Sequence, residues 1–202
     1  MRIFAIAGLV IALAAVAVPT QAQQADHHTE GFRARLKAKY LERRDRFMHR
    51  VKDVYFAENK ILKTLPKMAK AAQSKELKAA FVKHERETRG HVKRLQEIFK
   101  ILGKPARAKT CDAIMGITRE GAEIMTDYKG MPALDAGLLA AGQAVEHYEM
   151  SRYGTLRTWA EELGMKDAAA LLDATLKEEK ATDAALTTLA KSVVNVEAEH
   201  QL

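Results

Sequence analysis

The pattern that decides the fold is clearest in residues 133–164, ALDAGLLAAGQAVEHYEMSRYGTLRTWAEELG. Positions separated by alternating steps of three and four residues share one face of a helix. On that face the segment is apolar at both ends, from Leu139 to Leu163, but carries Glu146 and Glu149 in the middle. An unpaired buried carboxylate costs several kcal/mol. The segment therefore predicts a long helix whose centre faces a polar partner inside the fold.

The same pattern recurs along the rest of the chain. Ser74 is a suitable helix N-cap, and Gly103, Gly130 and Gly164 are suitable stops. Pro66 is expected to kink the first helix or to lie near its end. No segment alternates in the manner of a strand. The periodicity predicts long helices over about 41–72, 74–102, 133–163 and 166–191, with a short helix over about 110–126.

The lengths of the connections predict the topology. The first two long helices are joined by almost no linker, and so are the last two, whereas about thirty residues separate the pairs. Two helical hairpins joined by one long crossover is the ferritin-like arrangement. We therefore predict an all-α protein, a ferritin-like four-helix bundle with a long crossover carrying a short fifth helix.

The composition of the 202 residues agrees with such a bundle. Apolar residues make up 48% and aromatic residues only 6%, and the formal net charge is +7. The single cysteine, Cys111, excludes an intramolecular disulfide and any Cys-rich metal site. Any metal must therefore be held by His, Asp and Glu.

The first residues are typical of a secretory signal peptide. Met1 and Arg2 precede an apolar run that ends before Pro19, and small residues follow up to Ala22. We expect cleavage after Ala22 and a periplasmic or secreted product; an uncleaved N-terminal anchor is the alternative. The expected organisation is a signal peptide over 1–22, a polar and basic mobile lead-in over 23–42, the bundle over 43–195 and a tail over 196–202.

Positive charge is densest between Arg33 and Lys52. Such a stretch can contact nucleic acid or an anionic lipid surface. It also contains Glu and Asp at helical spacing and lacks the interleaved aromatic residues that single-strand binders use. We interpret it as a solvated helix face, and we expect neither a nucleic-acid partner nor a membrane partner after signal cleavage.

The polar centres of the four long helices predict a metal site. Five carboxylates and two histidines converging inside one bundle need positive charge among them, and a pair of metal ions supplies it. Mixed carboxylate and imidazole ligands suit iron or manganese. The arrangement departs from the usual di-iron pattern in two ways. Its His motif is Glu87-x-x-x-His91 or His84-x-x-Glu87, neither of which is Glu-x-x-His, and Asp183 stands where a second His would be. The candidate ligands are Glu58, His84, Glu87, His91, Glu146, Glu149, Glu179 and Asp183.

Other side chains next to the polar centres have candidate supporting roles. His147, Tyr148 and Glu178 can orient the ligands, and Tyr55, one turn before Glu58, can relay an electron or donate a hydrogen bond. A metal-free bundle, in which Lys or Arg reaches inward to pair with the acids, is the alternative interpretation of the same pattern.

Several stretches of the chain resemble the YciE/YciF family of ferritin-like stress proteins. They are YFAENKILKTLPKMAKAA (55–72), ELKAAFVKHERETRGHVKRL (76–95), CDAIMG (111–116), residues 135–164 and LLDATLKEEKATDAALTTLA (171–190). The resemblance implies a ferritin-like bundle with a di-metal site and a stress-associated role. The positions that it implies for the site are Glu58, His84, Glu87, Glu146, His147, Glu149, Glu178, Glu179 and Asp183. Family members often have Gln where this chain has His91, so the assignment of His91 as a ligand rests on its position on the helix face alone.

The sequence therefore predicts an exported ferritin-like protein that binds iron or manganese as a di-metal centre, with a stress-related role in metal handling or in O2 or peroxide chemistry. The alternative is a metal-free bundle that serves as an oligomerisation or interaction module. We expect a homo-oligomer, with a dimer as the simplest form. The sequence assigns no catalytic residue.

Overall fold

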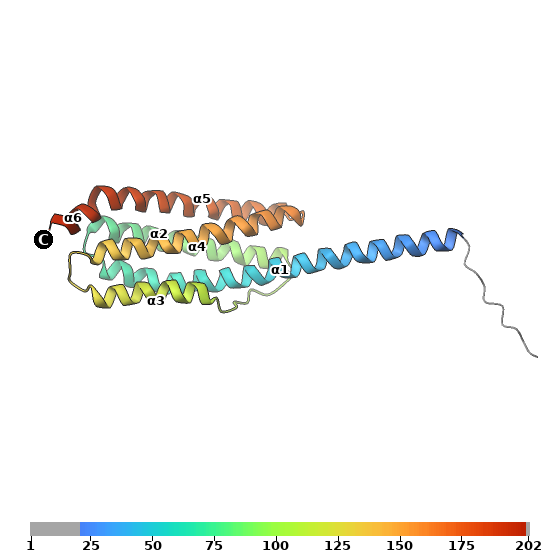
Figure 1. Cartoon of the computed structure of the whole chain (residues 1–202), viewed down its shortest axis with the longest axis horizontal. Helices are drawn as coiled ribbons and strands as arrows, with labels where there is room; N and C mark the ends of the chain where they lie inside the picture. The colour runs from blue at the N-terminus through green and yellow to red at the C-terminus, as the bar shows by residue number, and fades with distance from the viewer. Residues whose placement is uncertain (1–20, 201–202) are drawn as a thin grey trace, which may run out of the picture. The chain divides into compact units, whose positions relative to one another are not determined.

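The computed structural model describes residues 21–200, and all the regular structure in that range is helical (Figure 1). Of the predicted signal peptide, 1–22, residues 1–20 lie outside the described residues. By its internal contacts the chain divides into a first unit, Met1–Lys39, and a second unit, Tyr40–Leu202. The helices are α1 (Gln21–Ala71), α2 (Lys75–Ile101), α3 (Asp112–Asp127), α4 (Leu134–Glu162), α5 (Lys166–Leu189), a π-helical turn η1 (Ala190–Val194) and α6 (Asn195–His200).

Helix boundaries follow the local signals in the sequence. The Ser74 hydroxyl accepts a hydrogen bond from the Leu77 amide at 3.1 Å and caps α2. Gly103 and Gly164 adopt positive φ angles of 66° and 71° directly after α2 and α4, where a side chain would strain the backbone. The prediction of α1 was wrong at its start, since this helix begins at Gln21 and not near Leu41. Strong helix formers dominate the residues before Leu41, and propensity extends the helix even where no core demands it.

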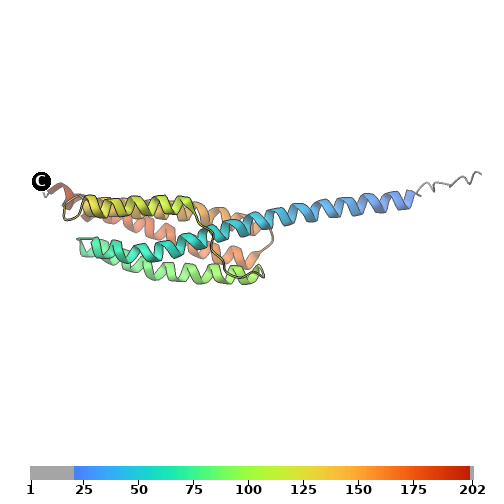
Figure 2. The same ribbon diagram turned by 90° about the horizontal axis from the view of Figure 1, so that it is seen from below.

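Two apolar clusters occupy opposite ends of the second unit. One contains the starts of α2 and α4 together with the ends of α1 and α5; the other contains the ends of α2 and α4. Helices α2 and α4 therefore run parallel to each other. Helix α3 runs in the opposite direction and brings the chain back to the end of the bundle where α4 begins, as Figures 1 and 2 show. The polar centres of the four long helices lie between the two clusters.

Helix α3 packs closely on α4. A Cβ placed on Gly137 would lie 2.8 Å from Cγ2 of Ile124, so only glycine permits this approach. At the start of α4, both carboxylate oxygens of Asp135 accept backbone N–H groups of the turn between α1 and α2, from Gln73 at 2.8 Å and Ser74 at 2.6 Å. These contacts join the two helical hairpins.

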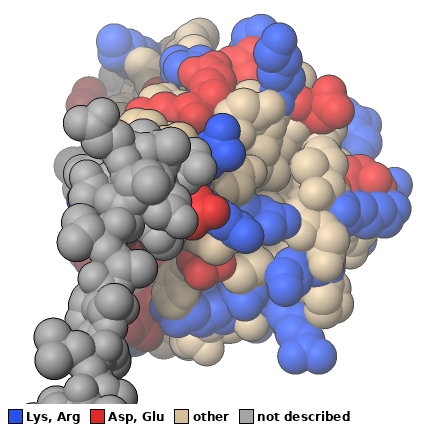
Figure 3. Space-filling view, turned by 90° about the vertical axis from the view of Figure 1, so that its right-hand side faces the viewer, with Lys and Arg blue, Asp and Glu red and all other residues tan. Residues whose placement is uncertain are grey.

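Charges on the surface are mixed in sign. On the face drawn in Figure 3, Lys and Arg side chains are interspersed with Asp and Glu. Several cations of the basic stretch have intramolecular partners: Arg44 donates to the Leu102 carbonyl at 2.8 Å, and Arg46 pairs with Glu42 at 2.9 Å. Among the described residues, no helix combines the length and apolarity that crossing a membrane requires.

Candidate metal centre

Six of the eight candidate ligands converge between the two apolar clusters. One comes from α1, two each from α2 and α4, and one from α5, and each is at most 3% exposed. Such complete burial of so many ionisable groups demands a compensating partner. The six are Glu58, His84, His91, Glu146, Glu149 and Glu179.

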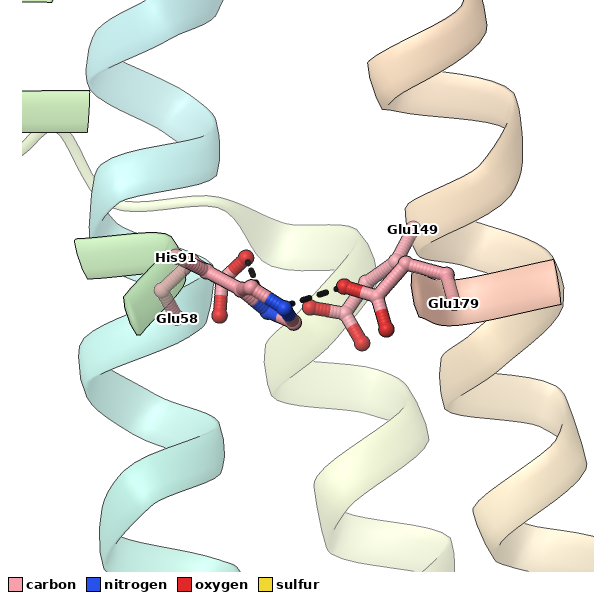
Figure 4. A group of neighbouring side chains, drawn as sticks. All are labelled: Glu58, His91, Glu149 and Glu179. Atoms are coloured by element: carbon pink, nitrogen blue, oxygen red, sulfur yellow. Dashed lines mark ion pairs between the residues drawn. The ribbon is translucent and has the colours of Figure 1, made fainter. Parts of the chain in front are cut away.

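The six residues form two overlapping groups of possible ligands. In the first, one donor atom each from Glu58, His91, Glu149 and Glu179 lies within 4.8 Å of the others (Figure 4). The second group meets the same limit with His84 and Glu146 in place of Glu58 and His91. Glu149 and Glu179 belong to both groups, which is the arrangement that two metal ions sharing bridging carboxylates need.

His84 faces α4. Its Nε2 atom lies 3.2 Å from Oε1 of Glu146 and 3.8 Å from Oε2 of Glu149. Burial, together with repulsion from His91, lowers the pKa of His84 to about 4. The neutral imidazole that results is the form that binds a metal.

His91 is held by a carboxylate outside the cluster. Its Nε2 atom hydrogen-bonds Oε2 of Glu178 at 2.9 Å, while Nδ1 lies 3.0 Å from Glu179 and 3.6 Å from Glu58. Arg94 donates to both oxygens of Glu178, at 2.8 and 2.6 Å. A carboxylate on the far nitrogen fixes the tautomer and the orientation of a metal-binding His. Figure 4 shows the His91 ring between Glu58 on one side and Glu149 and Glu179 on the other.

Without a metal, the cluster retains protons. Burial lowers the pKa of His91, but the adjacent Glu179 and Glu58 carboxylates outweigh it and raise that pKa to about 11. Burial, reinforced by repulsion from Glu179, raises the pKa of Glu146 to about 10. Burial likewise raises the pKa values of Glu149 and Glu179. Protons are thus the only positive charge that these groups can share in the absence of a cation.

The donor atoms of the cluster are largely unsatisfied. Buried polar groups normally have hydrogen-bond partners, so a group of orphaned donors and acceptors needs an explanation. A bound metal pair would satisfy them, and the donor set therefore fits one. The buried atoms without a hydrogen bond among the described residues include Oε2 of Glu58 and of Glu146, both ring nitrogens of His84, Nδ1 of His91, and both carboxylate oxygens of Glu149 and of Glu179.

Two candidate ligands lie outside the cluster. The Glu87 side chain is 23% exposed and pairs with Lys83 at 2.6 Å. Asp183 accepts from Gln143 at 3.1 Å and lies 3.3 Å from the exposed His147. Glu87 lies three residues after His84 and Asp183 four residues after Glu179, so each is at an edge of the face that its buried neighbour occupies. At such an edge, the packing of the neighbouring helices decides whether a side chain turns inward.

Two further side chains, neither of them predicted from the sequence, support the centre. Tyr153, fully buried on α4, donates a short hydrogen bond to Oε1 of Glu58. It occupies the place expected for Tyr55, whose hydroxyl instead accepts from Gln96 at 3.2 Å. The spacing in the sequence could have predicted Tyr153, because it follows Glu149 by one turn on the same helix face. Arg94 follows His91 by three residues, but its pairing with α5 could not be read from spacing.

The comparisons with known proteins agree with this architecture. Residues 42–199 match the family described as a domain of unknown function, DUF892. The chain is 42% identical to Protein YciF of Escherichia coli strain K12 over 159 residues, which cover 78% of this chain and 95% of YciF.

Two solved structures are also similar. The E. coli stress protein YciF superposes with a TM-score of 0.71 at 41% identity, covering 75% of this chain and 96% of its own. YcfI from Rhodopseudomonas palustris has the same TM-score and identity, covering 72% and 93%. These matches confirm the resemblance seen in the sequence, and the chain therefore belongs to the YciF family, a family of DUF892 domains.

Proposed function

We propose that this chain is a ferritin-like four-helix bundle that binds two iron or manganese ions in its polar centre. The observation that carries the proposal is the pair of four-residue groups that share Glu149 and Glu179 and have unsatisfied donor atoms. Four ionised carboxylates carry the charge that two divalent cations neutralise, and the nitrogen and oxygen donors suit iron or manganese.

The residues around the centre have separable roles in this proposal. His91 and His84 supply nitrogen ligands, and Glu58, Glu146, Glu149 and Glu179 supply oxygen ligands. Glu178 and Arg94 orient His91, and Tyr153 fixes one oxygen of Glu58. Apolar clusters flank the centre on both sides. A redox-active metal pair would supply electron exchange with O2 or peroxide, consistent with a stress-related role like that in the description of E. coli YciF.

We further propose export, on the basis of the charged start, apolar run and small residues of 1–22. The mature chain would then act in the periplasm or outside the cell as a homodimer, a form that rests on analogy with other helical bundles.

Elemental analysis of the mature protein, residues 23–202, purified without a His tag or chelator, tests the metal centre. We expect about two equivalents of iron or manganese per chain. The double variant Glu58→Ala with Glu149→Ala should lose the metal and melt at a lower temperature than the loaded wild type. Glu42→Ala with Glu161→Ala is the matched control, because it removes exposed carboxylates from the same two helices.

The alternative, an interaction module with a vestigial site, predicts the opposite result. The wild type would bind no metal after anaerobic reconstitution with Fe(II) or Mn(II). The double variant would be as stable as the wild type or more stable, because removing unpaired buried charge is neutral or favourable.

A further inference from the structure

A small cavity adjoins the proposed metal centre. Its volume is about 20 Å³, enough for one water-sized molecule, and His84 and Glu146 form part of its wall. Nearly all of the remaining exposed wall is apolar and comes from the helices α1 to α5, with Ile61, Leu65, Phe81, Val145 and Leu186 among the lining residues. A molecule held there would touch the His84 side of the cluster.

The cavity shares a wall with an open groove on the surface. The groove lies between α2 and α5 and is lined by Ala79, Ala80 and Lys83 on one side and by Ala185 and Leu186 on the other. Three residues line both spaces: Ala80, Thr182 and Leu186. A single layer of side chains, one of them only a methyl group, therefore separates solvent from the cavity.

The chemistry of the wall selects the occupant. A stable buried water needs two to four polar partners, whereas an apolar cavity stays dry and admits small apolar molecules. The polar atoms of His84, Glu146 and Thr182 contribute almost nothing to the exposed wall, so the cavity favours an apolar occupant. Dioxygen is apolar and of that size; hydrogen peroxide is polar and would have to give up its hydration. From this geometry, and building on the function proposed above, we propose that the groove, the Ala80–Thr182–Leu186 wall and the cavity form the access route by which dioxygen reaches the metal centre.

Besides His84 and Glu146, one polar side chain of the wall has no hydrogen-bond partner among the described residues. The Thr182 hydroxyl is buried and makes no hydrogen bond among the described residues. By contrast, two other threonines of the lining are satisfied by their own helices: Thr64 donates to the Lys60 carbonyl and Thr118 to the Ile114 carbonyl. A free hydroxyl at this place can donate to an oxygen atom that gains negative charge as dioxygen is reduced. Thr182 is thus a positioning residue on the route.

Xenon tests the route without any metal, because it enters small apolar cavities. Crystals of the metal-free mature protein under xenon pressure should show one xenon atom between Phe81, Leu186 and His84. Ala80→Leu, which fills the shared wall, should abolish that xenon. Ala79→Leu is the matched control, since Ala79 lines the groove but not the cavity, and it should retain the xenon.

The second readout is O2 consumption by protein loaded anaerobically with Fe(II). One O2 takes one electron from each of two Fe(II) ions and two protons from water, giving two Fe(III) and hydrogen peroxide. Ala80→Leu should slow this reaction about tenfold, as expected for a blocked gate, and leave Fe(II) stoichiometry unchanged. Thr182→Val should also slow it while retaining xenon, and Thr182→Ser should restore the wild-type rate.

An ordered water in the cavity in place of xenon, or equal slowing by Ala79→Leu and Ala80→Leu, would overturn the route. A wild-type rate in Thr182→Val would overturn the role of its hydroxyl. The two proposals fail separately. A protein that binds two metals but admits no xenon refutes only the route, whereas a protein that binds no metal refutes the proposed function whatever the xenon shows.

Discussion

At the residue scale, the orientation of His91 is the feature on which the centre depends most. One ring nitrogen faces Glu58 and Glu179, and the other is held by Glu178, itself fixed by Arg94. The Arg94 hydrogen bonds lower the pKa of Glu178, which keeps it ionised and able to accept from His91. A chain of charge-assisted contacts thus extends from the surface to the candidate ligand.

Replacing Glu178 with Gln should weaken metal binding without removing a ligand. Loss of an outer partner of a ligating His typically lowers metal affinity by about 10–100-fold. Competition with a chelator measures the change. Asp173→Asn is the control on the same helix, because Asp173 pairs with Arg157 and Lys177 away from the centre. Equal metal affinities in the two variants would show that Glu178 does not support the metal centre.

At the element scale, Asp135 links helices that are distant in sequence. Its carboxylate, 6% exposed, accepts the amides of Gln73 and Ser74, which begin the turn into α2. Without this acceptor, two amides at the α1–α2 turn lose their partner. One side chain at the start of α4 thus connects the two helical hairpins, beside the hydrogen bond that the Gln73 side chain donates to the Met131 carbonyl at 2.8 Å.

Asp135→Ala should destabilise the protein by about 1–3 kcal/mol, the cost of leaving two partly buried donors unsatisfied. Urea denaturation of the metal-free protein measures this. Asp167→Ala is the matched control: Asp167 also lies in the first turn of its helix but is exposed. If Asp135→Ala lowers the free energy of unfolding no more than Asp167→Ala does, Asp135 stabilises the protein only through its interaction with the helix dipole.

At the scale of the whole molecule, the buried cluster couples folding to pH. Near neutral pH the unfolded chain has released the protons of Glu146 and His91, whose ordinary pKa values are 4.5 and 6.5. The folded, metal-free chain keeps them, since these pKa values are raised to about 10 and 11. Because the folded state binds more protons, its stability falls as pH rises. His84, whose pKa is lowered to about 4, acts in the opposite direction only below its ordinary value of 6.5.

The metal-free protein should therefore lose stability between about pH 7 and pH 9, by up to about 1.4 kcal/mol per pH unit for each retained proton. Metal binding should release those protons, so calorimetry in buffers of different ionisation enthalpy should detect them. Thermal melts of the metal-free protein at three pH values give the change of stability with pH, and Glu146→Gln should make this change smaller. A metal-free wild type with a flat profile and no proton release on loading would contradict the burial of these charges.

The helices and the polar centre were predictable from the sequence because both depend on local spacing. Ser74, Gly103 and Gly164 mark boundaries through the conformations they favour, and alternating steps of three and four residues placed Glu58, His91, Glu149 and Glu179 on buried faces. The start of α1 was wrong, because propensity continues a helix past the residues that pack, and α6 (Asn195–His200) was not predicted as a helix.

Tertiary structure alone decided which polar residues meet. Spacing could not separate Glu87 and Asp183, which turn toward Lys83 and Gln143, from Glu146, which turns inward. Helical phase fixes the direction of a side chain only to within a sector of the helix face. Partners on other helices then depend on how the four helices are rotated and packed, a non-local property that is absent from the spacing within any one of them.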